Sequence, residues 1–117
     1  MAKADRFARI DDRRAELEDE YTAALIAALR TTASGKPGLF GHTSDARTCA
    51  LIAPVVDNLN EIADAIDDAR KQLAMPPYDL HLQFLASRGP VGPQAVGERK
   101  QAQAWLDRLE ERADVKP

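Results

Sequence analysis

Aromatic residues, cysteines and long apolar runs are all scarce in this chain. Phenylalanine, tyrosine and tryptophan together make up 5% of the 117 residues, and no alternating run of β-branched residues provides a strand. A single cysteine excludes an intramolecular disulfide and is consistent with a reducing cytoplasm. The longest apolar run, Ala23 to Leu29, is far shorter than the ~20 residues that span a bilayer. Residues 1–20 lack the apolar core of a signal peptide. We therefore expect an all-helical, cytoplasmic protein with no membrane partner.

Clustered positive charge is lacking as well. The chain has 16 lysines and arginines against 19 aspartates and glutamates, a net charge of -3, and the basic residues are dispersed. Nucleic acids and anionic membranes usually require a concentrated basic surface. The composition therefore argues against a nucleic-acid partner.

Helical periodicity is what the sequence does contain, and it is strongest between residues 44 and 74. Apolar residues recur there at steps of three and four: Ile52, Val55, Leu59, Ile62, Ile66, Ala69 and Leu73. Thr43 or Ser44 can serve as the N-cap. Pro54 cannot donate a backbone hydrogen bond, so we expect one long helix that is kinked at this residue.

Three further helices are predicted around this one. They cover about residues 3–32, 77–88 and 98–113, and the lengths give two long and two short helices in all. A chain of this length forms one domain. We expect residues 1–117 to fold as a single small helical bundle, with 1–5 and 114–117 frayed.

The N-terminal half of the first predicted helix carries a narrow apolar seam in a highly charged sequence. The seam residues are Phe7, Ile10, Arg14, Leu17 and Tyr21, at the spacing of a short coiled coil. Two interpretations remain open. This half either lies along the bundle, with Arg14 reaching to water, or pairs with another chain.

The loop after this helix, between Gly35 and Thr43, holds two large apolar residues, Leu39 and Phe40. They either close the end of the core or form an exposed anchor for a partner. His42 follows in the loop, and Cys49 lies early in the next helix, so the two side chains could meet at this end of the bundle. A small-ligand or metal-binding pocket here is therefore the alternative function.

No catalytic or cofactor-binding motif is recognisable in the sequence. The glycine-rich loop lacks the spacing of a P-loop, and neither a nucleophile elbow nor a dinucleotide fingerprint is present. We therefore predict no catalytic residue, no metal ligand and no cofactor, and favour a non-enzymatic role. The predicted function is a protein–protein interaction module, including self-association through the first helix.

Overall fold

The computed structural model describes residues 2–42, 45–89 and 97–114. These stretches contain four helices and no strand: α1 (Ala2–Ala33), α2 (Ala46–Gln72), α3 (Asp79–Ala86) and α4 (Glu98–Asp114). The predicted all-α class, with two long and two short helices, is confirmed, and each boundary agrees to within two residues.

The two ends of the chain are helical as far as the structure describes them. Residues 2–5 belong to α1, and Asp114 belongs to α4. Asp5 in the first turn of α1 favours this start, because a carboxylate there interacts well with the positive end of the helix dipole. Residues 1 and 115–117 lie outside the described part of the chain. The fraying expected at both ends stays a prediction.

The start of α2 differs from the prediction in its capping residue. Asp45 is the N-cap, and its carboxylate accepts hydrogen bonds from the backbone N–H and the hydroxyl of Thr48. Thr43 and Ser44, which were predicted to cap, lie outside the described residues. The helix continues through Pro54 as one element. The kink expected from the missing proline N–H stays a prediction.

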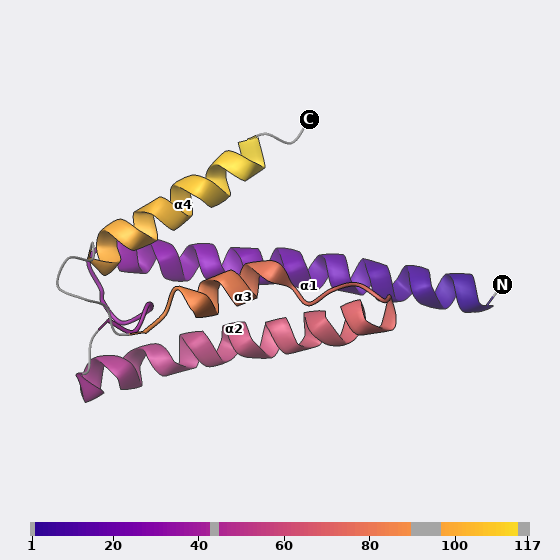
Figure 1. Cartoon of the computed structure of the whole chain (residues 1–117), viewed down its shortest axis with the longest axis horizontal. Coiled ribbons are helices and arrows are strands. Elements are labelled where there is room, and N and C mark those ends of the chain that lie inside the picture. Colours follow the sequence, from indigo (N-terminus) through magenta and orange to yellow (C-terminus); the bar gives the residue numbers. More distant parts are fainter. Residues whose placement is uncertain (1, 43–44, 90–96, 115–117) are drawn as a thin grey trace.

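The two long helices lie side by side and run in opposite directions (Figure 1). The short α3 returns along α2, and α4 packs against the C-terminal half of α1 with its far end pointing away from the bundle. The N-terminal end of α1 extends past the end of α2. One end of the molecule therefore has contributions from all four helices, whereas the other end consists mainly of α1 and α2.

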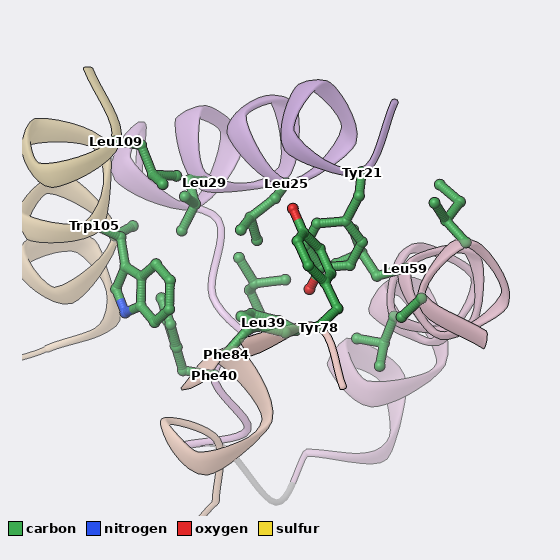
Figure 2. Close-up of a cluster of buried hydrophobic side chains, with 14 of the residues drawn as sticks. Tyr21, Leu25, Leu29, Leu39, Phe40, Leu59, Tyr78, Phe84, Trp105 and Leu109 are labelled. Carbon is green, nitrogen blue, oxygen red and sulfur yellow. The ribbon is translucent and has the colours of Figure 1, made fainter. Parts of the chain in front are cut away.

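The aromatic core lies at the four-helix end (Figure 2). The ring centroids of Phe40, Phe84 and Trp105 are 6.1–6.5 Å apart, and the rings come from the α1–α2 loop, α3 and α4. Leu39 and Phe40 are completely buried. The two apolar loop residues therefore close the core, which is the first of the two interpretations of this loop.

Candidate interaction surface

The α1–α2 loop is fixed to the start of α4 by a buried carboxylate. Glu98, the first residue of α4, accepts hydrogen bonds from the backbone N–H groups of Gly38 at 2.8 Å and Phe40 at 2.6 Å. Gly38 has a φ of +117°, which other residues rarely adopt, and a Cβ there would come within 3.0 Å of the Thr48 side chain. A residue with a side chain would therefore be strained at position 38, both in its backbone and against Thr48.

The residues that follow α3 also hold this loop. Nε of Arg88 donates to the Leu39 carbonyl at 2.7 Å, and the backbone N–H of Gly89 donates to the Phe40 carbonyl at 2.8 Å. Leu39 and Phe40 were candidate binding residues. Because both side chains are buried and both backbones are tied down, neither is accessible to a partner in this conformation.

His42, another candidate binding residue, lines a cavity. The cavity walls come from the end of α1, the following loop and the first turn of α4, and include Thr32, Glu98 and Arg99. Nε2 of His42 is buried and has no hydrogen-bond partner among the described residues. Cys49 is exposed on α2 and does not line this cavity. In the described part of the chain, no three histidine, cysteine or acidic side chains are grouped closely enough to hold a metal ion.

Three of the five seam residues on α1 make contacts within the chain itself. Leu17 and Tyr21 are buried in the core. Arg14 contacts Asp11 and Glu18, each at 2.8 Å, and the hydrogen bond that it donates to Glu18 is the main reason that the pKa of Arg14 is raised. Of the predicted interface residues, Phe7 is 47% exposed, and Ile10 and Arg14 are partly buried.

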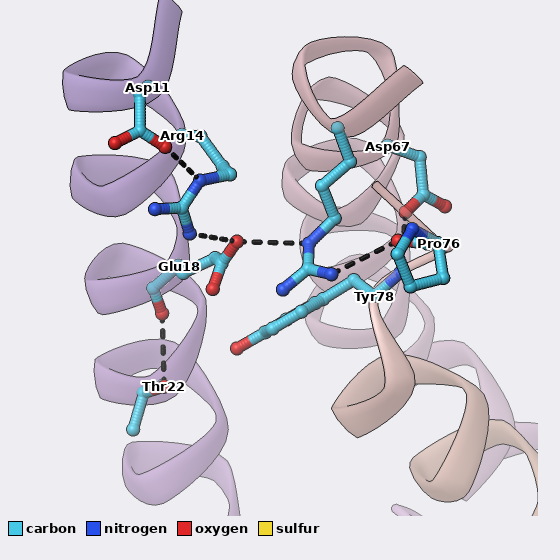
Figure 3. Close-up of polar contacts among 8 residues, drawn as sticks. Asp11, Arg14, Glu18, Thr22, Asp67, Pro76 and Tyr78 are labelled. Carbon is cyan, nitrogen blue, oxygen red and sulfur yellow. Dashed lines mark hydrogen bonds and ion pairs between the residues drawn. The ribbon is translucent and has the colours of Figure 1, made fainter. Parts of the chain in front are cut away.

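Glu18 connects the two long helices through a second arginine (Figure 3). Its carboxylate lies 3.0 Å from Nε of Arg70, whose Nη1 donates to the Pro76 carbonyl at 3.0 Å. The Arg70 guanidinium also lies over the Tyr78 ring, 5.2 Å from its centroid. These side chains fix the segment between α2 and α3 against α1. The network is therefore structural, and it marks the border of the two-helix end.

Tyr21 and His81 form a second buried polar contact between α1 and α3. The Tyr21 hydroxyl lies 2.7 Å from Nδ1 of His81, and both side chains are buried. Burial raises the pKa of Tyr21 and lowers the pKa of His81. Both groups are therefore neutral near pH 7, and the hydroxyl and Nδ1 share one hydrogen bond. The contact holds α3 against α1.

Beyond this border, an open groove runs between the N-terminal half of α1 and the C-terminal part of α2. Ile10, Leu17, Ala65 and Ala69 provide apolar contacts along it. The α1 wall also carries three arginines, and the α2 wall carries polar residues: Arg6, Arg9, Arg13, Asp68 and Gln72. The groove is therefore a shallow apolar strip with a positively charged side.

The arginine wall was missed by the sequence analysis, although its signal is visible. Arg6, Arg9 and Arg13 follow one another at steps of three and four, so they share one side of the helix. The apolar seam is the more obvious pattern because buried residues determine packing. The exposed residues beside the seam form the accessible surface.

Comparison of the chain with protein-family models, curated proteins and solved structures gives no match. None of the described helices is long and apolar enough to cross a membrane. Function must therefore be inferred from the surface itself.

Proposed function

We propose that the protein is an interaction module that forms a homodimer through the groove between α1 and α2, in the cytoplasm as its composition suggests. The observation that carries the proposal is the open apolar strip beside the arginine wall. The two-helix end offers little else to cover Ile10 and Ala65, which are both only partly buried. Burial of such a strip against a second helix is favourable, at roughly 25 cal/mol per Å² of apolar surface.

The charge distribution along α1 favours a second copy as the occupant. The arginine wall is followed on the same helix by an acidic stretch, Glu16 to Glu20. A two-fold interface requires a surface that is complementary to itself, and a helix with a basic and an acidic portion satisfies this requirement.

Sedimentation equilibrium and native mass spectrometry of the untagged protein test this proposal. We expect a dimer for the wild type and a folded monomer for Ile10→Asp, because a carboxylate at the apolar strip would have to be desolvated. Ala65→Arg, which places a long cationic side chain over the groove, is a second variant with the same expected result.

Leu82→Asp is the matched control, since Leu82 is 49% exposed on α3 and away from the groove. This variant should remain dimeric. A wild type that stays monomeric at the highest attainable concentration, or groove variants that dimerise as the wild type does, would overturn the proposal.

The unpartnered Nε2 of His42 supports a second candidate function, a small-ligand site in the adjacent cavity. A ligand with a hydrogen-bonding group could satisfy this nitrogen, which is otherwise expensive to bury. Native mass spectrometry of the same sample tests it. A small molecule that is retained by the wild type and lost in His42→Phe would support this candidate, and a bare mass in both would argue against it.

A further inference from the structure

Five exposed charged residues form a single row along the N-terminal half of α1: Arg6, Arg9, Arg13, Glu16 and Glu20. Their steps of three and four residues place them on one side of the helix. The first three also belong to the arginine wall of the groove. The row is therefore basic over its first part and acidic over its second part.

The charges of this row are largely unpaired within the chain. Arg13 and Glu16 are 3.4 Å apart, with side chains 62% and 69% exposed. Among the described residues, Arg6, Arg9 and Glu20 make no ion pair. An exposed pair of this kind contributes little to stability, so the row is available for contacts outside the chain.

The order of the charges selects one arrangement of two copies. Parallel helices in register would bring arginine against arginine and glutamate against glutamate. In antiparallel helices, Arg13 can face Glu16 of the partner subunit while Arg9 faces Glu20 of the partner subunit. Both pairs have the same midpoint along the helix, between residues 14 and 15. A single two-fold axis through this point therefore produces both pairs, and each of them occurs twice.

Other antiparallel registers pair fewer of these charges. A shift that places Arg6 against Glu20 of the partner subunit brings Arg13 against Arg13 of the partner subunit. A shift that places Arg6 against Glu16 of the partner subunit brings Arg9 against Arg13 of the partner subunit. Only the register centred between residues 14 and 15 gives both glutamates an arginine.

We infer that two copies associate with the N-terminal halves of α1 antiparallel, with Arg13 against Glu16 of the partner subunit and Arg9 against Glu20 of the partner subunit. This inference rests on the proposed homodimer and adds its orientation and register. The partner helix then lies along the arginine wall of the groove. The ion pairs determine the register more than the affinity, and raising the ionic strength weakens the dimer.

Two charge-swap variants with the wild-type net charge test the register. Arg13→Glu combined with Glu16→Arg exchanges two residues that face each other, so their contact persists with reversed sign and the contact of Arg9 is unchanged. Arg13→Glu combined with Glu20→Arg instead brings the glutamate introduced at position 13 against Glu16 of the partner subunit. The arginine introduced at position 20 then meets Arg9 of the partner subunit. Every contact in the second variant is therefore between like charges.

Sedimentation equilibrium should show a dissociation constant within a few-fold of the wild type for the first variant. The second should dimerise at least about tenfold more weakly, since reversal of several exposed pairs sums to more than about 1.4 kcal/mol. Circular dichroism checks that both variants fold.

The outcomes separate this inference from the proposed function. If the wild type dimerises through the groove but both swaps weaken it equally, or neither does, the register is wrong while the homodimer stands. If the wild type is monomeric, the proposed function itself fails and the register fails with it.

Discussion

The two ends of this molecule differ in how their residues are used. At the four-helix end, the rings of Phe40, Phe84 and Trp105 pack together, and the loop that carries Phe40 is held by backbone hydrogen bonds. At the two-helix end, Ile10 and Leu17 of α1 and Ala65 and Ala69 of α2 line an open groove beside a row of arginines. The first end provides the packing that defines the fold, and the second leaves surface for association.

The distribution of aromatic residues shows the same division. Five of the six aromatic side chains are buried in the core, and Phe7 alone is exposed, near the N-terminus of α1. Because large side chains dominate the energy of a core, stability should be concentrated where they gather. Glu18 and Arg70 lie at the border between the two regions.

Phe40→Ala should have the largest effect and tests the packed end directly. The side chain is completely buried between α3 and α4, so its loss removes apolar contacts and leaves a cavity. We expect a loss of about 3–5 kcal/mol in the free energy of unfolding, measured by urea denaturation. A loss below about 1 kcal/mol would mean that the loop is not part of the core.

Glu98→Gln should have the next largest effect, because it weakens the attachment of the loop to α4. The carboxylate accepts two backbone hydrogen bonds, from Gly38 and Phe40, one on each oxygen. The glutamine amide has only one accepting oxygen, because its NH₂ group can only donate. We expect a loss of about 1–3 kcal/mol in the same measurement. Glu111→Gln, an exposed position on the same helix, is the control and should change stability by less than about 0.5 kcal/mol. Equal effects at the two positions would contradict this role.

The sequence was sufficient for the fold because the signals there are local. Apolar periodicity defined the helices, and the glycine-rich loop marked where the first of them ends. Burial of Leu39 and Phe40 remained open, because it depends on α3 and α4, which are distant in sequence. The acceptor role of Glu98 was not predictable, since it joins groups about 60 residues apart. The arginine wall could have been found from its spacing.

The His81 contact predicts a pH dependence that originates at the packed end. Burial holds the pKa of His81 below its ordinary value of 6.5 and outweighs the opposing effect of Asp67 and Asp64. As the pH falls, His81 is therefore protonated near pH 6.5 in the unfolded chain but only at lower pH in the folded chain. The free energy of unfolding should decrease as the pH falls from about 7 to 5, and this decrease should be smaller in His81→Gln. Thermal unfolding of both proteins across this range measures the difference, and parallel curves would contradict the prediction.

Phe7→Ala should have the smallest effect and is the counterpart of Phe40→Ala at the open end. Phe7 is 47% exposed, so its removal takes away little buried surface and leaves no enclosed cavity. We expect a change below about 0.5 kcal/mol in the free energy of unfolding at low protein concentration.

The same measurement at high protein concentration tests whether Phe7 contacts the second chain, because association stabilises a folded chain by mass action. Phe7 and the arginine row lie on different sides of α1, so a dimer in the inferred register leaves this small effect unchanged. A loss that grows with concentration would instead place the second chain against Phe7.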